Sequence, residues 1–419
     1  MRIHIKNGRV VDPASGRDGV ADLFVSDGKI AEEFSRADRV IDAKGLVVSP
    51  GFIDLAARLR EPGYEYKATL DSEMAAAAAG GVTSLACPPD TDPPLDEPGL
   101  VDMLRRRAKA LAKARVHPLG ALTVKLKGEA LTEMGQLTDA GCVAFSQANA
   151  FIADTQVLWR AMQYAATFGY AVWLRAEDAW LARDGVAHDG EMATRLGLPG
   201  IPSFAETIAL GTLLELARAT GARLHVCRLS TAGAVELIRR AKAEKLPVTC
   251  DVGIHHLHLC DVDLGYFDSH CRLDPPLRSQ RDRDALARGA AEGVIDCLVS
   301  DHTPVDEDRK HLPFGEAEAG ATGLELLLPL ALKWGEAQKL PLAATLARIT
   351  SHPGAILGVR AGRIALGEAA DLALFDPRAP LRVSPETLKS QGKNTPFLGY
   401  ELSGKVRYTL VDGNVVYEA

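Results

Sequence analysis

Apolar residues follow two different patterns along the chain. Near both ends, short segments alternate apolar and polar residues, as strands with one exposed face do. This alternation predicts strands at Arg2–Ile5, Arg9–Val11, Ala21–Val25, Lys29–Glu32, Leu46–Ser49, Asp371–Phe375, Val406–Val411 and Asn414–Tyr417. The pairs Asn7-Gly8 and Asp27-Gly28 predict hairpin turns, and Asp412-Gly413 joins the last two strands. Because neither end alone has enough strands for a stable sheet, we expect both ends to build one small β-sandwich.

Between the two ends, short apolar strands alternate with longer amphipathic or alanine-rich segments that predict helices. The strands are expected at Gly51–Leu55, Val82–Cys87, Val116–Ala121, Cys142–Ser146, Ala171–Arg175, Arg223–Cys227, Val248–Val252 and Cys297–Ser300. Eight strand–helix units in about 300 residues predict a (β/α)₈ TIM barrel. We therefore expect a barrel over residues 51–354 and a composite β-sandwich domain over residues 1–50 and 355–419. The segment Ala179–Glu206, rich in Gly, Asp and Pro, is expected to lie over the barrel mouth.

The composition narrows the class of protein. Hydrophobic residues make up 47% of the chain and charged residues 25%, a balance typical of a globular protein. The net charge of −7 does not indicate the basic surface that binding to nucleic acid or to an anionic membrane requires. No run of about 18 apolar residues predicts a membrane span. Seven scattered cysteines without a CxxC pair indicate reduced thiols and a cytoplasmic location.

In such a barrel the chemistry lies where the strands end, so the residues after each strand are the candidates. The runs that carry a resemblance are Pro50-Gly51-Phe52-Ile53-Asp54, Leu59-Arg60-Glu61-Pro62-Gly63, Ala144-Phe145-Ser146, Ala176-Glu177-Asp178, His225-Val226-Cys227, His255-His256-Leu257, Pro275-Pro276-Leu277-Arg278, Asp301-His302 and Asn394-Thr395-Pro396-Phe397. Together they resemble the dihydroorotase branch of the amidohydrolase superfamily over nearly the whole chain. No serine lies in a nucleophile elbow, and no glycine-rich phosphate loop leads from a strand into a helix.

The resemblance implies a zinc hydrolase fold in which the zinc ligands have been replaced. Active members of the family are expected to hold zinc with His-x-His after the first strand and a carboxylate or carboxylated lysine after the fourth. A histidine each after the fifth and sixth strands and an aspartate after the eighth complete that set. Zinc needs lone pairs from imidazole, thiolate or carboxylate groups. At the ligand positions this sequence has Ala56, Arg58, Gln147 (or Ala148), Arg175, Arg228 and Asp301.

Arginine is chemically the opposite of a metal ligand. It carries five donors and no acceptor, and it keeps its proton in a protein. We therefore expect Arg58, Arg175 and Arg228 to stand in for the metal charge and to neutralise Asp301, Glu177 and neighbouring carboxylates. Asp301 alone is not expected to catalyse a reaction, and no zinc or other cofactor is expected. Arg58→Ala is expected to destabilise the protein by about 1–3 kcal/mol if it leaves a buried carboxylate unpaired.

The positions that would bind the substrate carboxylate have changed as well. The resemblance implies three contacts there, from an arginine, an asparagine and a histidine. Arg60 is retained, but Asp90 stands at the asparagine position and Val305 at the histidine position. Because the charge of Asp90 would repel an anionic substrate, we expect Arg60 and Asp90 to be vestigial.

These observations leave a leading hypothesis and several alternatives. The arginine pattern resembles a bacterial group of non-catalytic dihydroorotase-like chains, which implies a structural or assembly subunit for aspartate carbamoyltransferase in pyrimidine biosynthesis, within a homo- or hetero-oligomer. The main alternative is an active or altered cyclic amide hydrolase acting on dihydroorotate or a related ring. A third is a sensor that binds a small anion among Arg58, Arg60, Arg175 and Arg228. The histidines at 255, 256 and 258 could form a relocated metal site, although the family has a His-His-Leu run there in any case.

Overall fold

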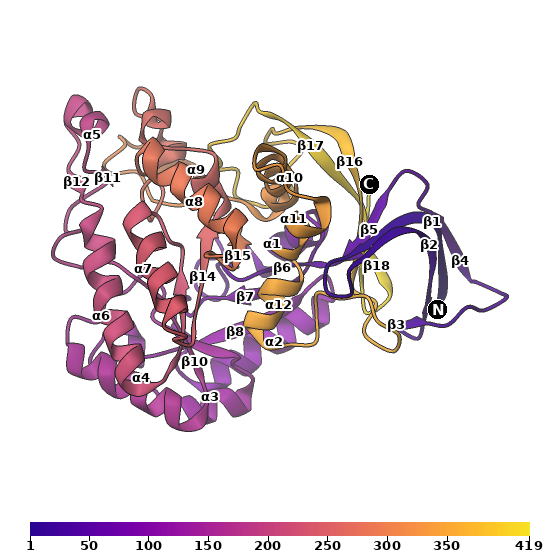
Figure 1. Ribbon diagram of the computed structural model, residues 1–419, viewed down its shortest axis with the longest axis horizontal. Helices are drawn as coiled ribbons and strands as arrows, with labels where there is room; N and C mark the ends of the chain where they lie inside the picture. Colours follow the sequence, from indigo (N-terminus) through magenta and orange to yellow (C-terminus); the bar gives the residue numbers. More distant parts are fainter.

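Eight parallel strands form the centre of the larger domain in the computed structural model, which describes residues 1–419 (Figure 1). In spatial order they are β6 (Phe52–Asp54), β7 (Val82–Cys87), β8 (Arg115–Ala121), β9 (Ala144–Ser146), β10 (Ala171–Arg175), β13 (Arg223–Cys227), β14 (Val248–Gly253) and β15 (Cys297–Val299). The eight predicted barrel strands are confirmed, with ends that differ by no more than two residues. A parallel bridge between Ala57 and His302 joins β15 to β6 at the carboxyl ends, so the barrel is nearly closed.

Helices surround the barrel, as the alternating pattern predicted. They are α1 (Leu70–Ala79), α2 (Pro98–Leu111), α3 (Met134–Ala140), α4 (Thr155–Phe168), α6 (Phe204–Thr220), α7 (Ala232–Ala243), α8 (Gln280–Glu292), α10 (Leu327–Ala337), α11 (Leu342–Ala347) and α12 (Ser351–Leu357), with the short helices α5 (Glu191–Leu196), α9 (Glu307–Lys310), η1 (Val124–Leu126), η2 (Ile254–Leu257), η3 (Asp261–Leu264), η4 (Ser269–Cys271) and η5 (Leu324–Leu326). Hydroxyl caps begin several of them; Thr231, for example, accepts from the Ala234 amide at the start of α7. None of the helices combines the length and apolar character that crossing a membrane requires.

The strand side chains separate into two apolar layers. On β13, Leu224 and Val226 belong to the large core between strands and helices. His225 and Cys227 face the other way, toward the small core inside the barrel, which includes Trp173. Because side chains alternate along a strand, the residues at the carboxyl ends are aimed either at the helices or at the barrel mouth.

The two ends of the chain meet in one mixed sheet, which forms the small β-sandwich domain. Its strands are β1 (Arg2–Asp12), β2 (Arg17–Ser26), β3 (Lys29–Ala31), β4 (Arg39–Asp42), β5 (Val47–Pro50), β16 (Leu372–Arg382), β17 (Glu401–Val411) and β18 (Asn414–Glu418). The antiparallel pairing of β5 with β16 connects the two ends, as predicted. Helix α12 spans the boundary expected between residues 354 and 355 and contributes Leu357 to the barrel interior, so that boundary stays a prediction.

The hairpin predicted at Asn7-Gly8 is wrong. These residues form a bulge inside one continuous strand, β1, which pairs with β4 before the bulge and with β5 after it. Asn7 adopts φ 63°, and a Cβ on Gly8 would lie 2.5 Å from Val48 Cγ2. The same residue types that favour a two-residue turn also suit a bulge, and the neighbouring strands select between them. The Asp27-Gly28 and Asp412-Gly413 turns do join paired strands.

The segment expected over the barrel mouth has secondary structure of its own. It contains the two-stranded parallel sheet of β11 (Ala187–His188) and β12 (Gly200–Ile201), with α5 between them. It lies at the end of the barrel that also carries α9 (Figure 1). Two arginines hold it there: Arg272 donates to the Val186 carbonyl at 3.0 Å, and Arg278 donates to the Ile201 carbonyl at 2.6 Å.

Candidate functional site at the barrel mouth

Four residues with side chains adopt the left-handed backbone conformation just beyond the barrel strands. Their φ angles are 62° at Arg60, 50° at Ala148, 56° at Arg228 and 47° at Asp301. For an L-residue this conformation costs roughly 1–2 kcal/mol. Residues with such strained backbone angles are found most often at functional sites. The mouth therefore has the backbone geometry of a site, whichever side chains it now carries.

Arg58 occupies the centre of this mouth. Its Nε donates to Asp90 Oδ2 at 2.7 Å, and its Nη1 donates to Thr303 Oγ1 at 3.1 Å and to Asp301 Oδ1 at 3.4 Å. Its Nη2 donates to Asn149 Oδ1 at 3.1 Å. The side chain is only 7% exposed. Arg58, which follows β6, thus joins residues that follow three other barrel strands.

Arg228 and Arg175 complete the charged cluster. Arg228 Nη1 donates to Asp301 Oδ1 at 3.2 Å and to the Asp274 carbonyl at 3.0 Å. Arg175 Nη1 donates to Asp274 Oδ2 at 2.7 Å, and its Nη2 is paired with Glu177. The pairing of all three guanidinium groups with carboxylates, which the sequence predicted, is therefore confirmed.

Burial and ion pairing compete at each carboxylate of the cluster. Burial opposes ionisation of Asp90, but the Arg58 guanidinium outweighs it and holds the Asp90 pKa below its usual range. Burial is likewise outweighed at Asp274, where Arg175 and Arg228 lower the pKa. Burial raises the pKa of Asp301 despite Arg228 and Arg58, whose contacts with it are longer. The cluster is an internally neutralised network rather than a free cationic pocket.

Two members of the cluster were missed by the sequence analysis. Asn149 Oδ1 accepts from both Arg58 and Arg228, and its Nδ2 donates to Asp274 Oδ2 at 3.0 Å. Asp274 directly precedes the Pro275-Pro276 run that carried part of the resemblance, and Asn149 lies among the residues just after β9. Both residues lie next to segments that the sequence had singled out. Their contacts could not be predicted, because they are far from the other members of the cluster along the chain.

Three of the predicted site residues do not join the cluster. Gln147 turns away, and its Nε2 donates to Thr123 Oγ1 at 2.9 Å and to the Leu126 carbonyl at 2.9 Å. Ala56 contributes its carbonyl, which accepts from the His302 amide at 3.0 Å. Arg60 donates to the Pro304 carbonyl at 2.8 Å and lies 3.8 Å from Glu318.

The donor chemistry of these positions does not fit a zinc ion. Ala56 has no ligand atom, and Arg58, Arg175 and Arg228 direct N–H donors into the mouth. The Gln147 amide is engaged with Thr123. The one possible ligand of the set, the Asp301 carboxylate, already accepts from two arginines. A divalent cation placed beside these guanidinium groups would also be repelled by several kcal/mol per contact, at about 4 Å and an effective dielectric near 20.

The histidines after β14 do not form a common site. His256 Nε2 bonds to the Pro275 carbonyl at 3.1 Å and His258 Nε2 to the Leu330 carbonyl at 3.0 Å, while His255 stacks on Phe397. The three imidazoles thus serve separate packing contacts. His302 is likewise engaged in a hydrogen bond, because its Nε2 lies 2.5 Å from Glu73 Oε2.

Acidification is expected to destabilise the protein through these buried histidines. Burial, the largest cause in each case, lowers the pKa of His255 to about 3 and those of His256 and His258 to about 4. The unfolded chain, with histidine pKa values near 6.5, therefore binds more protons than the folded protein between about pH 6.5 and 4. The free energy of unfolding should fall across this window, on the order of several kcal/mol for the three together.

Urea unfolding at a series of pH values measures this effect. The slope of stability against pH should become shallower in His258→Gln, and His311→Gln, at a side chain that is 70% exposed, is the control for a surface substitution. Equal stability of the wild type at pH 6.5 and pH 4 would contradict the prediction.

Comparisons with known proteins give the family of the chain and agree with its fold. A family model described as "Dihydro-orotase-like" matches residues 45–234. A protein of Pseudomonas aeruginosa named "Dihydroorotase-like protein" is 45% identical over the full length of both chains, and one of the same name from Pseudomonas putida is 46% identical over 100% of this chain and 99% of that one. A "Dihydroorotase" of Geobacter sp. strain M21 is 39% identical over the full length of both. Among solved structures, the L-hydantoinase (dihydropyrimidinase) of Arthrobacter aurescens superposes with a TM-score of 0.88 and 27% identity, covering 99% of this chain and 96% of that one.

Proposed function

This chain belongs to the dihydroorotase-like family, and we propose that it is a non-catalytic member that acts as a structural or assembly subunit of aspartate carbamoyltransferase in the cytoplasm. The barrel then serves as a scaffold in pyrimidine biosynthesis rather than as a hydrolase. The protein works within an oligomer in this proposal, and the surface that meets the partner lies outside the barrel mouth.

The contact that carries the proposal is the position of Asp301 between Arg58 and Arg228. A catalytic aspartate must accept a proton from an attacking water, which requires a free lone pair directed at a metal or a substrate. Oδ1 of Asp301 instead accepts from both guanidinium groups, and Asn149 lies against the same two arginines. The proposal is supported by this arrangement, because the side chains next to Asp301 are hydrogen-bond donors to it and not metal ligands.

The partner is proposed from the resemblance of the arginine pattern to non-catalytic chains that associate with aspartate carbamoyltransferase. The full-length likeness to two proteins named "Dihydroorotase-like protein" is consistent with a group set apart from the dihydroorotases. The retained strained backbone at the mouth fits a fold that lost its chemistry and kept its scaffold.

Dihydroorotate turnover by the purified protein is expected to stay at background with and without added zinc. The quadruple variant Ala56→His, Arg58→His, Arg175→His and Arg228→His should stay at background as well. Gln147 would still supply no carboxylate, and Asp90 and Val305 would still fail to bind the substrate carboxylate. Turnover by the wild type that is lost in Asp301→Asn would instead establish the active cyclic amide hydrolase.

Association with aspartate carbamoyltransferase is expected in size-exclusion chromatography of the two proteins mixed at micromolar concentrations. A shared peak at a mass above that of either component would support the assembly role. Separate elution would reject it. A genome that encodes this chain should also encode a second dihydroorotase with an intact His-x-His pair, because pyrimidine synthesis still needs the activity.

A further inference from the structure

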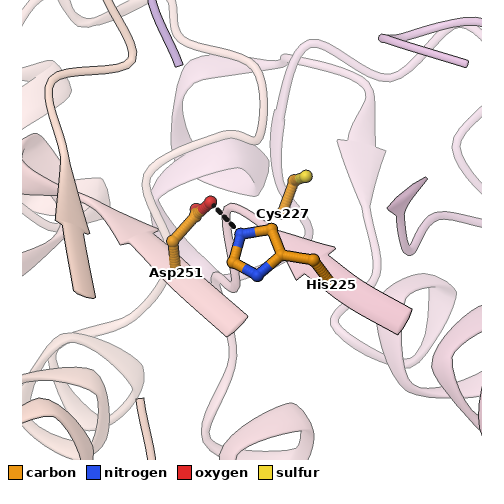
Figure 2. Close-up of side chains that lie close together, drawn as sticks. All are labelled: His225, Cys227 and Asp251. Carbon is orange, nitrogen blue, oxygen red and sulfur yellow. Dashed lines mark hydrogen bonds and ion pairs between the residues drawn. The ribbon is translucent and has the colours of Figure 1, made fainter. Parts of the chain in front are cut away.

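A second group of polar side chains lies inside the barrel, below the charged cluster. His225 and Cys227 project from β13 and Asp251 from the neighbouring strand β14 (Figure 2). One ligand atom from each of the three lies within 4.8 Å of the other two. In the parallel register His225 is opposite Thr249. The side chains of β13 and β14 that point into the barrel therefore lie side by side. Asp251 meets the two residues of β13 because of the sheet register, since it is distant from them in the sequence.

The three side chains offer the mixed nitrogen, sulfur and oxygen set that a borderline metal ion prefers. Imidazole and thiolate suit zinc and similar first-row ions, whereas calcium and magnesium require mainly oxygen ligands. The thiolate of Cys227 and the carboxylate of Asp251 together match the charge of a divalent ion. The ligand positions at the mouth offer no such pair, because arginine fills three of them.

The present hydrogen bonds already orient two of the three side chains, His225 and Asp251. His225 Nε2 lies 2.8 Å from Asp251 Oδ2, and His225 Nδ1 lies 2.8 Å from Thr249 Oγ1. The Arg228 amide donates to Asp251 Oδ1 at 2.7 Å and fixes the carboxylate. Two tetrahedral zinc ligands at about 2.0 Å lie about 3.3 Å apart, so an ion would need to separate Nε2 and Oδ2 by only about half an ångström.

The same contacts argue against a thiol nucleophile. An imidazole that activates a cysteine must direct a ring nitrogen at the sulfur. Both nitrogens of His225 are engaged elsewhere, with Thr249 and Asp251. A metal ion, in contrast, can replace the proton between His225 and Asp251. The single ring proton of the neutral imidazole then moves from Nε2 to Nδ1, where the Thr249 hydroxyl can accept it, and the proton of the Cys227 thiol is released to water.

We propose that His225, Cys227 and Asp251 form a structural site for a divalent zinc-type ion, one layer deeper in the barrel than the position of zinc implied by the family resemblance. Binding deprotonates Cys227 and replaces the hydrogen bond between His225 and Asp251 with two metal bonds. The ion ties β13 to β14 next to the backbone of Arg228, whose guanidinium turns to Asp301 and the Asp274 carbonyl, so that its charge is already paired. The site needs neither Asp301 nor any hydrolytic activity.

Metal binding to the full-length protein tests the proposal. The protein, treated with a chelator and dialysed, is titrated with Co²⁺, whose spectrum reports its ligands, and then with Zn²⁺. One equivalent of Co²⁺ should bind in a tetrahedral spectrum with thiolate-to-cobalt absorption, and Zn²⁺ should displace it and raise the melting temperature. This measurement uses the wild-type protein, so it does not depend on whether a variant folds. The absence of binding, or a cobalt spectrum without a thiolate band, would overturn the proposal.

Two cysteine variants locate the ion. Cys227→Ser should weaken Co²⁺ binding at least roughly tenfold and remove the thiolate band, because a ligand costs at least as much as an outer-shell partner. Cys297→Ser is the matched control, since Cys297 is buried in the same interior core and lies outside the group. Equal loss in both variants, or retention of the band in Cys227→Ser, would reject the site.

The outcome is separable from that of the proposed function. Binding that depends on Cys227 with dihydroorotate turnover at background leaves both proposals standing. Turnover lost in Asp301→Asn would contradict the non-catalytic role whether or not Cys227 binds a metal. Failure of the cobalt titration would leave the assembly role untouched.

Discussion

Arg58→Ala is expected to lower the free energy of unfolding by roughly 3–5 kcal/mol, the range for removing one partner from a buried ion pair. The sequence suggested a smaller cost, based on one unpaired carboxylate. In the structure Arg58 donates hydrogen bonds to Asp90, Asp301, Thr303 and Asn149. Its removal therefore leaves several acceptors without a donor. The pKa of Asp90, which the guanidinium holds down, should rise in the variant.

Denaturant unfolding measures this change. The free energy of unfolding should fall while its slope against denaturant concentration stays the same. Arg106→Ala is the control, because Arg106 is exposed on the outer helix α2 and should alter stability by less than about 0.5 kcal/mol. Arg58→Lys should recover only part of the loss, since an ammonium cannot reproduce the planar set of donors. A melting temperature for Arg58→Ala equal to that of the wild type would show that water can replace the guanidinium.

Glu73→Ala is expected to cost a similar amount, roughly 3–5 kcal/mol, for a different reason. Glu73 on α1 is fully buried and accepts from His302 Nε2 at 2.5 Å, Ser390 Oγ at 2.6 Å and the Gln391 amide at 3.0 Å. These contacts join the first helix of the barrel to the residues after β15 and to a segment near the end of the chain. Alanine would leave the His302 and Ser390 side chains, which are both fully buried, without this acceptor.

Two variants separate charge from packing at this position. Glu73→Gln keeps the shape and should lose less stability than alanine, whereas Asp71→Ala on the same helix removes only an exposed pair with Lys113 and should cost at most about 1 kcal/mol. Burial opposes ionisation of Glu73, but His302 and the other donors hold its pKa below the usual range. The contribution of its charge is therefore present above the unfolded pKa near 4.3 and is lost as pH falls through the folded value. A gap between wild type and Glu73→Gln that widened on acidification would contradict this assignment.

The sequence by itself determined the barrel, because eight apolar strands separated by helical segments have few other ways to bury both faces of a parallel sheet. It also determined the chemical character of the mouth, since alanine and arginine exclude zinc coordination wherever their side chains point. Pairing of Arg58 and Arg228 with Asp301 followed from that character, because buried guanidinium groups need acceptors.

Only the tertiary structure decided which distant groups complete each cluster. Asp274 and Asn149 enter the mouth from segments far apart in the sequence, and Gln147 turns toward Thr123. Asn7 lies in a bulge because β1 pairs with β4 before it and with β5 after it. The convergence of His225 and Cys227 with Asp251 likewise depends on the register of β13 against β14. A sequence pattern reports which face a residue occupies, whereas contacts across the barrel depend on strand register and loop conformation, which arise only when all strands are in place.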